Sequence, residues 1–320
     1  MPTRGAAEAF PARMEAFLED LRVRRYSPAS ERRALSVLPR LFAFLAEGGV
    51  FHPCQTTEAH LVAFLRSLER AGSRRGTPLR PMTRRSQVHT VRRFFAFLVR
   101  RGVLLHDPAA GLPLPRPEHL PRTVLTQRQA ERLMEAPSST SPLGQRERAI
   151  LELLYGCGIR RGECERLEVS DLDLQQGTLL VKDSKGKRDR LVPLPGRAAA
   201  ALDLYLRESR PELLEDPREP ALFLSSAAGS RGRRLSAGAL NRVLAKHARA
   251  AGLPHVHPHA LRHTCATHLL QGGADLKHVQ ELLGHRSISS TVAYTRVGVR
   301  DLLEVLDRAH PRERRWRASR

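Results

Sequence analysis

The chain has 320 residues, of which 41% are hydrophobic, and this is sufficient for two domains of ordinary size with packed cores. Its 54 lysines and arginines exceed its 33 acidic residues, so the formal net charge is +21. Such an excess is typical of proteins that bind a polyanion, most often nucleic acid. The sequence has no run of about 18 apolar residues and no signal-peptide pattern. We therefore expect a cytoplasmic protein and exclude a membrane-spanning one.

The four cysteines are predicted to be reduced. They are Cys54, Cys157, Cys164 and Cys265, and no two of them form a CxxC pair. Without an export signal, we expect them to act as small hydrophobic residues.

Four amphipathic helices are predicted in the first 110 residues, because apolar residues recur there at helical spacing. They cover residues 7–25, from Ser27-Pro28 to Gly48-Gly49, 57–71 and 83–101. Gly102 has the position of a C′ glycine after the last of them. Three arginine pairs on that helix indicate a face for the DNA backbone, with a solvated face as the alternative. These pairs are Arg84-Arg85, Arg92-Arg93 and Arg100-Arg101.

A proline-rich stretch at 111–121 predicts a linker between a first domain, 1–110, and a second, 122–320. Residues Thr126 to Gln129 fit a capping box at the start of a helix. Two β-rich runs in 177–194 flank a polar turn, which predicts a hairpin. Further helices are expected near 145–156, 162–167, 197–209, 236–251, 258–271, 275–283 and 288–296. The predicted fold is mainly α-helical, with a small antiparallel β-sheet in the C-terminal domain.

The segment 255–270 contains five histidines, and a metal site was the first hypothesis to test. Its spacing fits neither a zinc finger nor a helical HExxH pattern, and no acidic partners are nearby. We therefore predict no metal and no cofactor. In a helix that begins at Pro258, His259 and Arg262 would share one face, where together they could bind a phosphate.

Two further cations are candidates for chemistry. Arg160 follows a glycine-rich turn, where it could point into a cleft, although a surface arginine is the ordinary alternative. Lys185 lies in the predicted hairpin turn, and a lysine beside a phosphodiester can protonate a leaving oxygen. A solvated turn lysine is the alternative for that position.

The stretch LGHRSISSTVAY places Tyr294 nine residues after His285 in a polar setting. Its phenol could be a packing group, a DNA contact or a nucleophile. The other tyrosines, Tyr26, Tyr155 and Tyr205, lie beside apolar helical positions and are predicted to pack in the core or at an interface. Two arginines, two histidines, a lysine and a tyrosine, without a carboxylate pair, suit metal-free attack by a tyrosine on a phosphodiester.

This pattern resembles the tyrosine recombinase, or phage integrase, family, and most closely its Xer-type members. The resemblance covers about 122–298 and fills all six motif positions in order. The motifs are GIR with Arg160, SKGK with Lys185, PHALRH with His259 and Arg262, LLGH with His285, and STVAYT with Tyr294. The arginine motif continues as GIRRGE, in which Glu163 is retained. Lys185 aligns better than Lys187 when counted back from RLVPL.

The resemblance implies a site-specific DNA recombinase that needs neither metal nor ATP. Tyr294 would form a 3′-phosphotyrosyl link, Arg160 and Arg262 would bind the phosphate, and Lys185 would protonate the leaving 5′-oxygen. His259 and His285 would assist proton transfer. The reaction would serve chromosome dimer resolution or the movement of a mobile element.

The resemblance also implies an assembly on double-stranded DNA. A homo- or heterotetramer on two DNA sites would exchange strands through a Holliday junction. The helical first domain resembles, more loosely, the SAM-like core-binding domain of the family, and the two domains would clamp the duplex. A helix at 299–309 would dock on a neighbouring protomer. A topoisomerase-like nicking-closing enzyme and a catalytically silent DNA-binding regulator are the alternatives.

Overall fold

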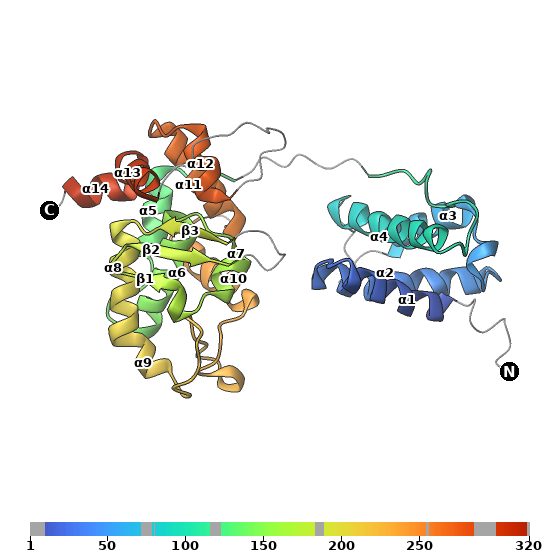
Figure 1. Cartoon of the computed structure of the whole chain (residues 1–320), viewed down its shortest axis with the longest axis horizontal. Coiled ribbons are helices and arrows are strands. Elements are labelled where there is room, and N and C mark those ends of the chain that lie inside the picture. The colour runs from blue at the N-terminus through green and yellow to red at the C-terminus, as the bar shows by residue number, and fades with distance from the viewer. Residues whose placement is uncertain are drawn as a thin grey trace. The chain divides into compact units, whose positions relative to one another are not determined.

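The computed structural model describes residues 10–71, 79, 81–115, 123–182, 189–253, 256–284 and 299–318. The chain divides into two compact units, Met1–Leu120 and Pro121–Arg320 (Figure 1). The border falls at the C-terminal end of the proline-rich stretch 111–121. Across the described ranges, no helix combines the length and apolar character needed to cross a membrane.

The first unit consists of helices. They are α1 (Phe10–Val23), α2 (Pro28–Glu47), the 3₁₀ turn η2 (Pro53–Gln55), α3 (Glu58–Ala71) and α4 (Pro81–Arg100). Ser27 is the extended residue before α2, and Pro28 takes the first helical position, where its missing N–H costs nothing. Gly102 has a φ of +68°, as predicted for a residue that ends α4. Aromatic rings fill the core between the helices, including Phe17 against Phe94 and Phe97.

Arginines of α4 hold the segment that follows this helix. Arg85 Nη1 donates to the carbonyl oxygen of Pro115 at 3.1 Å, and Arg92 Nη2 donates to that of Ala110 at 2.9 Å. Arg100 Nη2 lies 3.3 Å from a carboxylate oxygen of Asp20. These three arginines therefore use some of their N–H groups for hydrogen bonds within their own unit. Those N–H groups are not available to DNA, and a DNA-binding face on α4 stays a prediction.

The second unit is mainly helical and contains one small sheet. Its helices are α5 (Gln127–Glu135), α6 (Pro142–Gly156), α7 (Arg161–Arg166), α8 (Gly196–Leu204), α9 (Arg210–Leu213), α10 (Ala237–Ala250), α11 (Pro258–Gln271), α12 (Leu276–Leu283), α13 (Val299–Ala309) and α14 (Pro311–Ala318), with short turns η3 (Val169–Asp171), η4 (Tyr205–Ser209, π-helical) and η5 (Ala228–Ser230). The strands are β1 (Leu172–Asp173), β2 (Thr178–Val181) and β3 (Arg190–Pro193). They lie side by side in the order β1-β2-β3, all antiparallel, with Leu179 opposite Val192 (Figure 1). The predicted fold class is confirmed.

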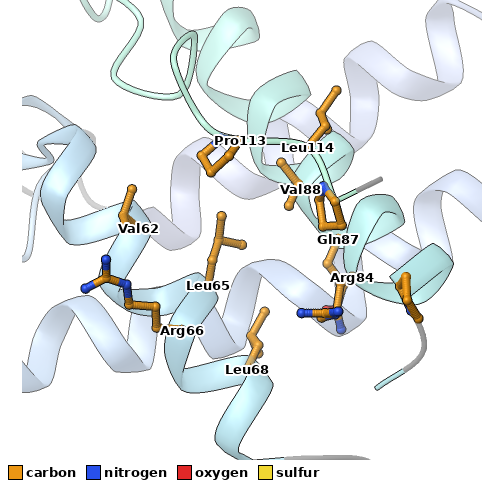
Figure 2. Close-up of a pocket in the computed structure, with 11 residues that line it drawn as sticks. Val62, Leu65, Arg66, Leu68, Arg84, Gln87, Val88, Pro113 and Leu114 are labelled. Atoms are coloured by element: carbon orange, nitrogen blue, oxygen red, sulfur yellow. The ribbon is translucent and has the colours of Figure 1, made fainter. Parts of the chain in front are cut away.

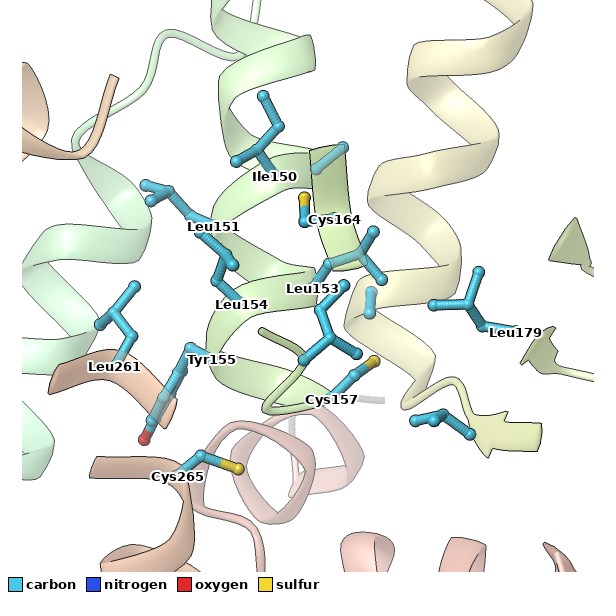
Figure 3. Close-up of a cluster of buried hydrophobic side chains, with 14 of the residues drawn as sticks. Ile150, Leu151, Leu153, Leu154, Tyr155, Cys157, Cys164, Leu179, Leu261 and Cys265 are labelled. Atoms are coloured by element: carbon cyan, nitrogen blue, oxygen red, sulfur yellow. The ribbon is translucent and has the colours of Figure 1, made fainter. Parts of the chain in front are cut away.

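The core of this unit surrounds α6, whose side chains are buried on nearly every side. Figure 3 shows Leu151 and Leu154 on one side of α6 and Leu153 on the other. Cys157, Cys164 and Cys265 are free and buried, as predicted, and burial raises the pKa of the Cys265 thiol to about 12. Cys54 of the first unit is free but exposed, so the prediction that it packs as a hydrophobic residue is wrong.

Caps explain where several helices begin. Thr126 and Gln129 form the predicted capping box, with each side chain accepting a hydrogen bond from the backbone N–H of the other residue. The helix predicted from residue 145 begins at Pro142, because the Ser141 hydroxyl accepts from the Gly144 N–H. The helix predicted near 288–296 lies outside the described residues.

The end of the chain folds back onto its own unit. Arg312 of α14 pairs with Glu152 of α6, and both side chains are buried. The carboxylate of Glu313 accepts from the backbone N–H groups of Gly196 at 2.9 Å and Arg197 at 3.2 Å, where α8 begins. The helix predicted over 299–309 is present as α13 and contacts α11 and β3. Its docking on a neighbouring protomer stays a prediction.

Candidate active site

Arg160 is held at the turn between α6 and α7. The chain leaves α6 through Gly158, whose φ of +59° suits glycine, and Arg160 is the N-cap residue of α7. Its Nη1 donates to Glu163 Oε1 at 2.7 Å, and its Nη2 donates to the carbonyl oxygen of Gly284 at 3.1 Å. The side chain keeps 39% of its surface exposed. The guanidinium is thus fixed at two points but is still accessible to a ligand.

Arg262 reaches the same region from α11. It is buried, and its Nη1 donates to the carbonyl oxygen of Gly158 at 2.6 Å. Its Nη2 donates to the carbonyl oxygen of Leu283, so it joins the end of α6 to the end of α12. Arg160 and Arg262 therefore bind adjacent carbonyls, those of Gly284 and Leu283. Burial, and next the positive charge of Arg160, lower the pKa of Arg262 to about 10.

His259 lies one turn before Arg262 in α11, at an exposed position, so the two share the predicted face. Partial burial, followed by the charges of His257 and Arg262, lowers the pKa of His259. Its imidazole is therefore neutral at pH 7. His257 is the N-cap of α11, since its Nδ1 accepts from the Ala260 N–H at 3.1 Å.

Glu163 carries the negative charge of the site and is shared by two arginines. It accepts from the Arg160 backbone and side chain, and also from Arg190 Nη1 at 3.0 Å and Nη2 at 2.9 Å. Burial alone would raise the pKa of Glu163, but the bonds from Arg190 and Arg160 outweigh it and lower the pKa to about 2. The carboxylate is ionised at every physiological pH.

Arg190 is a site residue that the sequence analysis did not predict. It begins β3, where it was considered only as part of a hairpin strand. One feature of the sequence could have indicated such a residue. Glu163 is an acidic residue within the GIRRGE motif, and a buried carboxylate needs a positively charged partner. Three arginines against one carboxylate leave a net charge of +2 at this turn, which suits a bound phosphate.

Three predicted site residues, Lys185, His285 and Tyr294, lie outside the described residues. Two of them adjoin described site residues in the sequence. His285 directly follows Gly284, which ends α12 with a φ of +63° and accepts from Arg160. Lys185 belongs to the stretch between the end of β2 and Arg190. The structure thus brings together Arg160, His259 and Arg262 from the predicted set, and it adds Glu163 and Arg190.

The remaining tyrosines differ in their surroundings. Tyr155 is 1% exposed and its Oη lies 2.8 Å from His268 Nδ1. Tyr205 is fully buried, and its hydroxyl donates to the Leu222 carbonyl oxygen at 3.0 Å. Both pack as predicted. Tyr26 is not a core residue, since it is 42% exposed with the Arg93 guanidinium 4.6 Å from its ring centre, and its place at an interface stays a prediction. Arg25, with a φ of +54°, turns the chain after α1 and carries Tyr26 away from the core.

The other pockets of the described residues contain none of the predicted catalytic residues. In the first unit, a pocket of about 480 Å³ is lined by α3, α4 and residues 113–115, among them Leu65, Val88 and Leu114 (Figure 2). Arg66 and Arg84 also contribute to its wall. Within the described part of the chain, no three His, Cys, Asp or Glu side chains gather as metal ligands would.

Comparison with known proteins relates both units to one family. Residues 123–300 match the phage integrase family, and residues 14–102 match the N-terminal SAM-like domain of phage integrases. The chain is 39% identical over 302 residues to tyrosine recombinase XerC of Oceanobacillus iheyensis, covering 93% of this chain and 96% of that protein. It is 41% identical over 310 residues to tyrosine recombinase XerC of Chromohalobacter salexigens, covering 95% and 97%.

Solved structures show the same fold. The XerH site-specific recombinase bound to its difH substrate is similar with a TM-score of 0.66 and 22% identity, covering 86% of this chain and 79% of that one. A lambda integrase tetramer bound to a Holliday junction gives a TM-score of 0.63 at 18% identity, with 91% and 80% covered. At these identities the likeness concerns the fold alone.

Proposed function

The chain belongs to the phage integrase family and is a site-specific tyrosine recombinase, and from this premise we propose which of its residues carry the reaction. The observation that carries the proposal is the pair of guanidiniums on adjacent carbonyls, Arg160 on Gly284 and Arg262 on Leu283. With Arg190 and Glu163, they give this turn a net charge of +2. A scissile phosphate bound there would have both nonbridging oxygens stabilised as negative charge develops on them.

Tyr294 is the proposed nucleophile. Its Oη attacks phosphorus, the phenolic proton passes to a histidine of the site, and the bond from phosphorus to the 5′-oxygen breaks, which leaves a 3′-phosphotyrosyl link. The surroundings of the other tyrosines support this assignment. Tyr155 and Tyr205 are buried with bonded hydroxyls, and Tyr26 lies in the first unit under Arg93. Burial also raises the pKa of Tyr205 to about 12, which opposes its use as a nucleophile.

Proton transfer is assigned to three further residues. Lys185 supplies a proton to the leaving 5′-oxygen. His259, neutral because its pKa is lowered, can donate a hydrogen bond to the phosphate or accept a proton. His285, which follows Gly284, assists the transition state. Rejoining reverses the same steps with the 5′-hydroxyl of the partner strand, so the bond energy is conserved without ATP, metal or another cofactor.

The assembly proposed is a tetramer of recombinase protomers, identical or mixed, on two double-stranded DNA sites in the cytoplasm. The name of one structural neighbour, a lambda integrase tetramer on a Holliday junction, motivates this proposal for the present chain. The first unit serves as the core-binding domain and the second as the catalytic domain. The charge of +21 favours contact of both with the phosphate backbone.

The experiment that tests the proposal is covalent capture of DNA. The protein is mixed with a library of nicked duplexes with randomised arms, in which cleavage near the nick releases a short fragment and traps the adduct. Wild type should form a covalent adduct, and sequencing of the trapped DNA gives the site. Tyr294→Phe should form none, whereas the matched control Tyr26→Phe should form as much as wild type.

Three outcomes contradict the proposal. An adduct that persists in Tyr294→Phe sinks the nucleophile assignment. DNA binding by wild type without any adduct on the whole library favours the catalytically silent regulator. A topoisomerase-like enzyme would instead trap duplexes without enrichment of a sequence.

A further inference from the structure

Arg190 binds the same buried carboxylate, Glu163, that holds Arg160. Its two terminal nitrogens bind the two oxygens of Glu163, and the Glu163 side chain is only 7% exposed. The same carboxylate holds Arg160 by its Oε1. Glu163 is therefore a bridge between a residue of the α6–α7 turn and the first residue of β3.

The charges of this bridge do not cancel. An isolated pair of Arg160 and Glu163 would be neutral, and Arg160 would then offer a phosphate only polarised N–H groups. With Arg190 on the same carboxylate, the three side chains keep one net positive charge. Arg190 itself is only 19% exposed and directs both terminal nitrogens at Glu163, whereas Arg160 is 39% exposed. The uncancelled charge is therefore accessible at Arg160.

A steric contact adds a second constraint. A Cβ built on Gly284 would lie 3.0 Å from Nε and 3.1 Å from Cδ and Cζ of Arg190. The Arg190 guanidinium thus packs against the backbone of the residue whose carbonyl oxygen accepts from Arg160. Arg190 therefore binds the carboxylate that holds Arg160, and it also lies beside Gly284, whose carbonyl is the second anchor of Arg160.

We propose that Arg190 is a positioning residue for DNA cleavage, which shares Glu163 so that Arg160 presents an uncancelled positive charge to the scissile phosphate. The inference rests on the proposed function and adds a residue to it. An ordinary structural ion pair between β3 and α7 would have similar geometry, but its loss would not depend on the charge of the DNA.

The test compares two DNA substrates. The duplex selected by wild type in the capture experiment is prepared with its normal scissile phosphate or with an uncharged methylphosphonate at that position. Arg190→Ala is expected to slow adduct formation on the normal phosphate by about 10- to 100-fold, the loss typical of a displaced catalytic group. Non-covalent binding of the duplex should change little. On the methylphosphonate, the difference between wild type and Arg190→Ala should fall to a few-fold.

Two further variants keep the result interpretable. Arg190→Lys restores the positive charge without the bidentate contact to Glu163, so it should recover part of the cleavage rate. It replaces Arg190→Ala if that variant fails to fold. Arg210→Ala is the matched control, because Arg210 is also partly buried but binds the carbonyls of Glu219 and Ala221 instead. It should cleave both substrates as wild type does.

The proposal is overturned if Arg190→Ala cleaves the normal phosphate at the wild-type rate. Equal slowing on both substrates also overturns it, since that pattern indicates a structural ion pair. Failure of wild type to form any adduct is a different result, because it removes the proposed function and the inference with it.

Discussion

Tyr155 and His268 form a buried hydrogen bond, 2.8 Å from Oη to Nδ1, that ties α6 to α11. Their rings meet edge to face, with centres 5.9 Å apart. The two helices carry the two proposed phosphate-binding arginines, since α6 leads into Arg160 and α11 contains Arg262. The bond therefore helps to set the spacing of these arginines, although neither partner belongs to the site.

Tyr155→Phe should lower both stability and cleavage. The change leaves a buried His268 nitrogen without this partner, at a cost of about 1–3 kcal/mol. Small movements of α6 against α11 should then slow adduct formation on the selected duplex. Tyr205→Phe is the control, because it loses buried bonds to the backbone of Leu222 and Leu224, which do not involve α11. It should lower the free energy of unfolding but keep the cleavage rate, and equal cleavage by both variants would contradict the coupling.

Glu163→Gln should destabilise the second unit in a pH-dependent way. The pKa of Glu163 falls from 4.5 to about 2 in the folded protein, which corresponds to about 3 kcal/mol of stability at neutral pH. Because the folded pKa is depressed, this contribution is complete above about pH 4.5 and is lost as the pH falls toward 2. Denaturant unfolding should show a gap between wild type and variant that closes over that range. A gap that stays constant would mean that the carboxylate charge contributes nothing.

Gly158→Ala should damage the turn that presents Arg160. A Cβ there would lie 2.6 Å from Leu283 Cδ2 in a backbone with a φ of +59°. The matched control is Gly252→Ala, which has a φ of +64° but no atom within 4 Å of the added Cβ. The control should lose only the roughly 1–2 kcal/mol of left-handed strain. Gly158→Ala should lose more stability and most of its cleavage activity.

His310 should make the second unit sensitive to acid. Burial, and next the charge of His268, lower the pKa of His310 to about 3. The unfolded chain takes up the proton near its ordinary pKa of 6.5, so stability is complete above that pH and falls as the pH drops toward 3. His310→Asn keeps an acceptor for the Arg312 N–H.

The variant should reduce the slope of the unfolding free energy against pH by up to about 1.4 kcal/mol per unit below pH 6.5. His106→Asn, at an exposed histidine of the first unit, serves as the control. Identical slopes for wild type and His310→Asn would contradict the prediction.

Capping and periodicity rules predicted the elements whose ends are fixed by residues close together in the sequence. Thr126 and Gln129 predicted a helix start because a capping box needs only four residues. The strand β1 has two residues, too few for any alternation to be visible. The helix α14 was missed because PRERRWRA has no apolar stripe. The ion pair of Arg312 with Glu152 and the hydrogen bonds that Glu313 accepts at the start of α8 fix it instead.

The site was predicted from motifs, and the sequence could not show how its members are held. Arg160 and Arg262 were predicted as phosphate ligands, but the carbonyls that orient them come from the ends of α6 and α12. Arg190 was missed for the same reason, because its partner Glu163 lies 27 residues away. Tyr26 was predicted from its apolar neighbours to lie in the core or at an interface, and its 42% exposure excludes the core.

The hydrogen bonds that orient the arginines also determine when the site can form during folding. Arg262 and Gly158 are 104 residues apart, Arg160 and Gly284 are 124 apart, and Arg312 and Glu152 are 160 apart. Contacts of such separation form late, because the loops that they close cost entropy before any contact rewards them. Until α12 packs against α11, Arg160 lacks the carbonyl of Gly284 and Arg262 lacks that of Leu283. If these arginines bind the scissile phosphate as proposed, we expect a partly folded chain to leave DNA uncut, and strand breakage to appear only with the completed fold.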